Sequence, residues 1–90
     1  MEYKDPADVL TFTAVFTNEL GGASITGRTV TVGAGLTKDS DALNGTDKVD
    51  IVLSGGTAGN TYKVTVNVVT NGGETFEKNF YVRVRNQFIG

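Results

Sequence analysis

Residues 62–85 read YKVTVNVVTNGGETFEKNFYVRVR, two alternating segments joined by a glycine-rich turn. In the first segment apolar residues occupy every second position, and in the second the apolar face is interrupted only by Lys78. Period-two alternation is typical of a half-buried strand, and Asn-Gly between two such segments is a strong hairpin signal. The sequence therefore predicts an antiparallel hairpin that turns at Asn71-Gly72-Gly73.

Segments with the same pattern occur in the rest of the chain, and no segment has helical periodicity. Residues 9–17 and 49–54 alternate in the same way. Residues 25–32 form another extended region, which Gly27 divides, and a glycine inside a strand pattern indicates a bulge or a tight corner. Several short strands separated by turns predict an all-β immunoglobulin-like β-sandwich of about seven strands in a single domain.

Tyr62 adds a specific argument for the sandwich. It opens a strand directly after the glycine-rich corner at residues 55–59, where sandwich domains place a corner tyrosine whose hydroxyl bonds back to the backbone. The alternative is that Tyr62 is an ordinary strand residue. We expect the sandwich to occupy residues 9–86, between an extended N-terminal arm at residues 1–8 and a C-terminal tail at residues 87–90.

Composition excludes several classes of function. The 90 residues include neither cysteine nor histidine, which removes disulfides, the commonest transition-metal ligand and the usual general base. No motif would activate a serine or threonine, so we expect neither an enzyme nor a cofactor. The net charge of −2 argues against a nucleic-acid partner, and no apolar run is long enough for a membrane span or a secretory signal.

The polar segment from Thr37 to Lys48 is interpreted as a long loop, with a short edge strand near Ala42 and Leu43. It is rich in carboxylates, which are the ligands that calcium prefers. The third acid and the closing glutamate of an EF-hand loop are absent, so a solvated acidic loop is favoured, although calcium binding stays open. The acids concerned are Asp39, Asp41, Asp47 and Asp50.

Candidate partner-binding residues occur near both ends of the chain. The outward face of the last strand combines tyrosine with arginine, the composition that interfaces favour, although charge on an exposed strand also discourages aggregation. Bulky apolar residues at a free end are expected to tuck onto the domain or dock on a partner. The predicted set is Tyr3, Lys4, Asp5, Tyr81, Arg83, Arg85 and Phe88.

Two motifs are similar to those of a known family. One is the start Lys4-Asp5-Pro6, and the other is the turn LSGGTAG at residues 53–59, followed by Tyr62. The chain resembles, over nearly its whole length, short proteins encoded among the virion structural genes of tailed bacteriophages and prophages. Members often carry tryptophans in the first strand region, where this chain has Phe16 and Glu19.

The resemblance implies a virion component that is made in the cytoplasm of the bacterial host. We interpret the chain as a non-enzymatic capsid decoration or cement protein that binds the lattice of the phage major capsid protein, or other virion proteins. The alternative is an immunoglobulin-like module of the tail, neck or fibre that binds a host receptor or glycan through Tyr3, Tyr81 and Phe88. A homo-oligomer fits the sequence, which specifies no number of subunits. The arm at residues 1–8 is expected to reach a neighbouring subunit, so that its deletion weakens attachment and leaves the domain folded.

Overall fold

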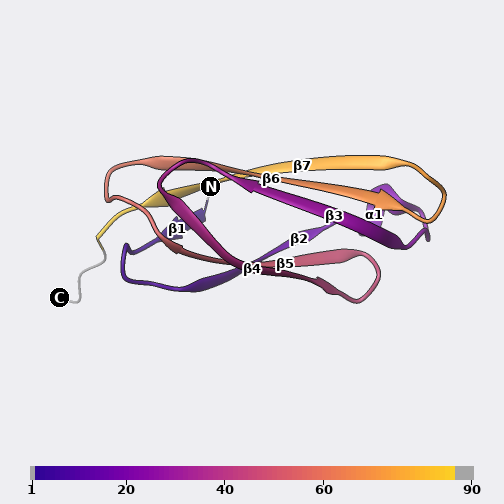
Figure 1. Cartoon of the computed structure of the whole chain (residues 1–90), viewed down its shortest axis with the longest axis horizontal. Coiled ribbons are helices and arrows are strands. Elements are labelled where there is room, and N and C mark those ends of the chain that lie inside the picture. The colour runs from indigo at the N-terminus through magenta and orange to yellow at the C-terminus, as the bar shows by residue number, and fades with distance from the viewer. Residues whose placement is uncertain (1, 87–90) are drawn as a thin grey trace.

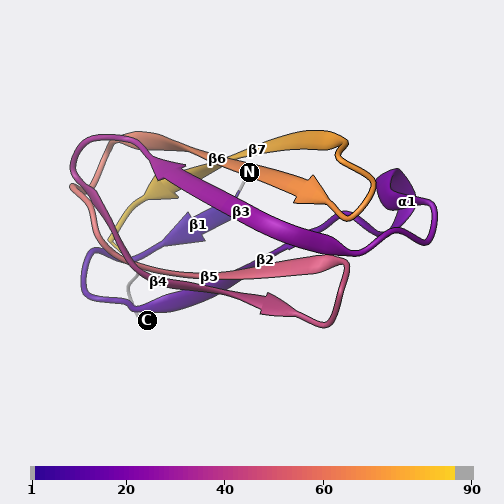
Figure 2. The same ribbon diagram turned by 45° about the vertical axis from the view of Figure 1, so that its right-hand side comes forward.

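The computed structural model describes residues 2–86, so Phe88 and the rest of the predicted tail lie outside the described residues. Its strands form two stacked sheets, with a single turn of helix at one end (Figures 1 and 2). The elements are β1 (Glu2–Lys4), β2 (Leu10–Val15), α1 (Thr17–Leu20), β3 (Ile25–Val32), β4 (Leu36–Asn44), β5 (Lys48–Gly55), β6 (Thr61–Thr70) and β7 (Thr75–Val84).

The strand order is that of an immunoglobulin-like sandwich. One sheet has the order β2-β5-β4, and the other has the order β1-β7-β6-β3. Immunoglobulin domains likewise place their second, fifth and fourth strands in one sheet and their third, sixth and seventh in the other. The first strand here lies on the second sheet, parallel to β7. The predicted all-β sandwich is confirmed.

The local signals that led to this prediction are also confirmed. β6 and β7 pair antiparallel from Thr61↔Arg83 to Val69↔Thr75, around the predicted turn. The pairing of β3 with β6 shifts register between Ile25 and Gly27, which is the bulge that the glycine indicated. Alternation buries the inward faces of β5, β6 and β7, and each buried Val, Leu, Ile or Phe side chain contributes roughly 1.5–3 kcal/mol.

The segment from Thr37 to Lys48 was predicted to be a loop with a short edge strand near Ala42 and Leu43; the edge strand is confirmed there, and the loop is wrong. Most of it forms β4, a nine-residue strand at the edge of its sheet, which a short turn at Gly45 joins to β5. β4 is solvated over most of its length, and its register shifts between Lys38 and Ser40. Without a continuous buried face, the strand lacks the alternation on which the prediction depended.

The predicted N-terminal arm is also corrected. Residues Glu2–Lys4 form strand β1, which pairs in parallel with β7. Lys4 lies opposite Val84, so its side chain is on the inner face of the sheet and is fully buried. The sandwich therefore includes residues that the sequence assigned to the arm, and their removal is expected to destabilise the domain.

Tyr62 makes the bond that characterises a corner tyrosine. Its ring is 7% exposed, and its hydroxyl accepts a hydrogen bond of 2.9 Å from the backbone N–H of Thr57. This bond, together with the side-chain amide of Asn60, lowers the pKa of the Tyr62 hydroxyl. The ring also lies against Gly35, where an added Cβ would be 3.1 Å from Cε1 of the tyrosine. Tyr62 thus connects the corner between β5 and β6 with the turn before β4.

Replacing Tyr62 with phenylalanine is expected to lower the Tm by about 4–8 °C, because the Thr57 N–H loses its acceptor. The matched control is Tyr81→Phe, since the Tyr81 ring is 47% exposed and lies on the outer face. Thermal unfolding followed by circular dichroism measures both variants. Equal Tm values for the two variants would show that the corner bond has no stabilising role.

Candidate interaction surfaces

The outer face of the four-stranded sheet carries a group of aromatic and basic side chains, called here the Arg/Tyr face. Because side chains alternate along a strand, the odd-numbered residues at the end of β7 share this face. Strand register adds Tyr3, which lies opposite Arg83. The face consists of Tyr3, Tyr81, Arg83 and Arg85.

Side chains of the Arg/Tyr face are exposed and partly held in place by one another. Tyr3 and Tyr81 are 46% and 47% exposed. The guanidinium carbon of Arg85 lies 3.9 Å from the centroid of the Tyr3 ring, within cation–π range, and Nη1 of Arg83 donates a 3.3 Å hydrogen bond to Oγ1 of Thr61. Tyrosine and arginine are the residues that most often dominate binding energy at interfaces. The structure brings together four of the seven predicted partner-binding residues.

Lys4 was predicted to bind a partner, but it is buried, and this prediction is corrected. Its Nζ donates hydrogen bonds of 2.9 Å to the carbonyl of Asp5 and 2.8 Å to the carbonyl of Gly55 on the opposite sheet. The half-buried Asp5 accepts a 2.9 Å hydrogen bond from the Ala7 N–H through Oδ1, which shapes the turn after β1. Lys4 therefore links the two sheets and is not available to a partner.

The acids considered for calcium are dispersed, and each has a protein partner. Asp41 bonds to Arg28 and Lys38, at 2.6 and 2.5 Å. The other acids accept hydrogen bonds from hydroxyl groups of Ser54, Thr13 and Thr17. Within residues 2–86 no group of three or more acids is placed to hold a metal ion. These carboxylates stabilise the three-stranded sheet and its edges.

Stability at low pH is expected to depend on Asp41. The hydrogen bond from Lys38 lowers the pKa of this carboxyl below its ordinary 3.8; burial opposes this effect, and Arg28 lowers the pKa further. A lowered folded-state pKa adds stability that is present above pH 3.8 and is lost as the pH falls through the folded pKa. Asp41→Asn should therefore lower the free energy of unfolding by about 0.5–1 kcal/mol at pH 7 and by less at pH 3. Urea unfolding at the two pH values tests this, and an equal loss at both would contradict it.

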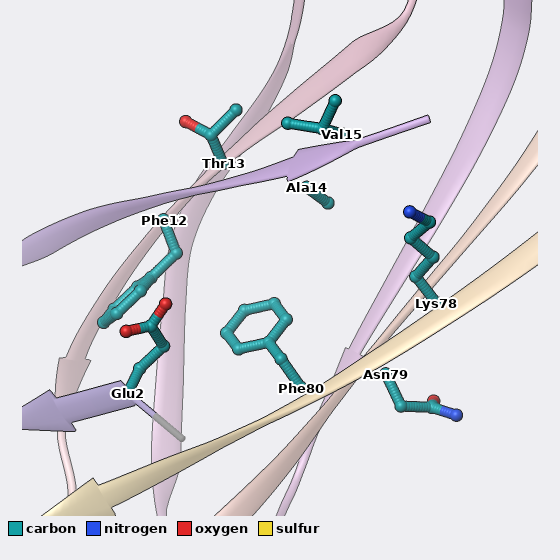
Figure 3. A pocket seen from close by; sticks show the side chains of 8 residues that line it. All are labelled: Glu2, Phe12, Thr13, Ala14, Val15, Lys78, Asn79 and Phe80. Atoms are coloured by element: carbon teal, nitrogen blue, oxygen red, sulfur yellow. The ribbon is translucent and has the colours of Figure 1, made fainter. Parts of the chain in front are cut away.

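A groove lies between β2 and the part of β7 that β1 does not cover, on one side of the sandwich (Figure 3). Its volume is about 270 Å³. Phe12 from β2 and Phe80 from β7 point toward one another across it, with ring centroids 5.7 Å apart. This groove was not predicted from the sequence, although Lys78, the charged residue on an otherwise apolar face, was a sign of it. The lining residues are Glu2, Phe12, Thr13, Ala14, Val15, Lys78, Asn79 and Phe80.

Comparison with known proteins identifies the family. A family model described as "Podophage GP4 fiber-tail adaptor protein gp77" matches residues 4–83, from β1 almost to the end of β7. A search among curated proteins finds no match. No helix in residues 2–86 is long and apolar enough to span a membrane. Because the match covers most of the sandwich, the chain belongs to the Gp77 family of podophage fiber-tail adaptor proteins and is a structural protein of the phage virion.

Proposed function

We propose that the chain is a non-enzymatic adaptor that joins a fibre to the phage tail through protein–protein contacts. The observation that carries this proposal is the family match over residues 4–83. The family description refers to the tail and its fibre and not to the capsid, so it supports the tail-associated alternative. It gives no support to capsid decoration through the major capsid protein.

The Arg/Tyr face is the surface best suited to one of these contacts. Arg83, Arg85 and the neighbouring Lys63 place three positive charges on one outer face of a chain whose net charge is −2. Complementary charge increases association rates and selects partners, while aromatic side chains contribute contact area. The corresponding partner surface would be acidic and would contain apolar patches.

Co-sedimentation with phage parts tests the proposed function. The purified chain is mixed separately with tails that lack it, with tail-free heads and with purified fibres. Saturable binding to tails and to fibres, and not to heads, is expected. Saturable binding to heads alone would overturn the proposal and restore the capsid interpretation.

The role of the Arg/Tyr face is tested in the same assay with the double variant Arg83→Ala, Arg85→Ala. We expect at least a tenfold loss of affinity for tails or for fibres, the scale of an interface hot spot. The matched control is Lys48→Ala, which removes a partly exposed cation, paired with Asp47, from the other sheet. If the double variant binds as tightly as the control, the contact lies elsewhere on the molecule.

A further inference from the structure

The two long sides of the sandwich, where the edges of the sheets face each other, are closed differently. On one side Arg28 of β3 crosses to Asp41 of β4, and Lys38 bonds to the same carboxylate. This ion-pair network bridges β3 of one sheet and β4 of the other. The opposite side, between β2 and β7, is the groove with the paired rings of Phe12 and Phe80. On this second side Phe12 and Phe80 are only partly buried, so part of the apolar interior is accessible.

The β7 edge of the groove has backbone groups without a neighbouring strand. β1 pairs with β7 only from Val82 onward, so within residues 2–86 the stretch 75–81 has no strand on its outer side. The N–H of Val84 bonds toward β6, to Asn60, whereas the N–H of Arg85 bonds toward β1, to Lys4. Since these directions alternate along a strand, the N–H and C=O groups of Glu77 and Asn79 point outward.

The walls of the groove combine apolar side chains with a charged group at each end. Phe12 and Ala14 come from β2, and Phe80 comes from β7 (Figure 3). Glu2 lies at one end of the groove and Lys78 at the other. The Lys78 ammonium is 2.7 Å from the carboxylate of Glu19 and 5.5 Å from the ring centroid of Phe16, so its position is fixed.

We propose that the β7 edge at residues 75–81 accepts an extended segment of a partner virion protein as an added strand. An open strand edge is satisfied by another extended backbone, and the chain itself already uses this edge in that way through β1. The segment would continue the line of β1 and place apolar side chains over Phe80 and an acidic one beside Lys78. This inference rests on the proposed adaptor function, because that function identifies the partner protein from which the segment would come.

Charge argues against a second copy of the chain as the occupant. In a symmetric antiparallel pair of β7 edges, residues on the same face must lie opposite each other. The register that uses all of residues 75–81 places Lys78 opposite Lys78, and a register centred on Glu77 places Glu77 opposite Glu77. A register centred on Asn79 avoids both like-charge pairs, but it is limited to residues 77–81, because β1 pairs with β7 from Val82 onward. Like charges directly opposite each other are destabilising. A different protein with an acidic residue at this position avoids both conflicts.

A tethered strand tests the geometry directly. The extension Thr-Val-Thr-Glu-Thr-Val, placed before Met1, would lie along residues 75–80 if the register of β1 continues. Its glutamate would then face Lys78, and its second valine would face Phe80. We expect the Tm to rise by at least about 4 °C. The matched control replaces the glutamate with lysine and should give a much smaller rise, and equal rises would overturn the inference.

Two proline variants identify which edge is used. Asn79→Pro blocks an outward N–H on β7, and Thr13→Pro blocks the corresponding position on β2, where proline at an edge is best tolerated. The extension should stabilise the Thr13 variant and not the Asn79 variant. Hydrogen exchange of the extended protein, with Glu77 and Asn79 becoming protected, gives the same information if a proline variant does not fold. Unchanged exchange at both amides would overturn the inference.

Binding to tails and fibres then separates this inference from the proposed function. A tethered strand has a millimolar effective concentration, so the extended protein should bind its tail or fibre partner at least tenfold more weakly than the unmodified chain. Equal binding by both proteins would overturn the groove inference and leave the adaptor function intact. If neither the extended protein nor the unmodified chain binds tails or fibres, the adaptor function is overturned, and with it the proposal that a partner virion protein supplies the segment. An unmodified chain that sediments as a dimer, and as a monomer once extended, would identify a second copy as the occupant and overturn the proposal.

Discussion

Gly56→Ala is expected to lower the free energy of unfolding by about 2–5 kcal/mol, among the largest effects of any single methyl group in this domain. The backbone of Gly56 has a φ of +91°, a conformation that residues with a Cβ rarely adopt. An added Cβ would also lie 2.6 Å from Cγ2 of the fully buried Val84. Backbone strain and overpacking therefore act together at this position.

Gly59→Ala separates the two causes. Gly59 has a similar φ of +96°, but an added Cβ there meets nothing within 4 Å. The control should therefore show only the strain, about 1–3 kcal/mol, and the difference between the two variants measures the overpacking. Urea unfolding at pH 7 provides both values. If Gly59→Ala costs as much as Gly56→Ala, close packing against Val84 is not what requires the glycine.

Lys4→Ala is expected to cost about 2–4 kcal/mol, because the partly buried carbonyl of Gly55 loses a charged donor and the fully buried side chain leaves a cavity. Lys4→Met keeps most of the apolar stem and isolates the loss of the ammonium, so it should cost less. Lys63→Ala, which removes an exposed lysine of β6, is the control and should change the free energy by less than about 0.5 kcal/mol.

The two Lys4 variants also decide between a structural and a binding role for this residue. A structural role predicts that Lys4→Met, measured well below its Tm, binds tails and fibres with unchanged affinity. Reduced affinity without reduced stability would restore Lys4 to the partner-binding residues. Urea unfolding and co-sedimentation on the same preparations give the two values.

The sequence predicted those parts of the fold in which a local pattern reports burial. The hairpin of β6 and β7 was predictable because both strands alternate around Asn71-Gly72-Gly73. The bulge in the pairing of β3 with β6 was predictable because a glycine inside a strand pattern, here Gly27, usually indicates one. β4 was missed because an edge strand that is solvated over most of its length carries no such alternation.

Contacts between distant segments could not be predicted in this way. β1 is three residues long, too short for periodicity, and it becomes a strand only by pairing with β7 at the other end of the sequence. For that reason Lys4 was assigned to an exposed arm, whereas the alternation in β7 correctly placed Tyr81 and Arg83 on an outer face. The groove depends on Phe12 and Phe80 meeting across two different sheets, and only the inward charge of Lys78 indicated it.

The parallel pairing of β1 with β7 has a mechanical consequence for the proposed role as an adaptor between fibre and tail. The chain enters β1 at one end of the pair and leaves β7 at the other, so tension applied through the two chain ends slides one strand along the other. The backbone hydrogen bonds of the pair, and the bonds of Lys4 across the sheets, would then resist the load together and not break one at a time. Pulling single molecules through the chain ends should need a higher force than pulling through Gly45 and the C-terminal end, and Lys4→Ala should lower the first force selectively.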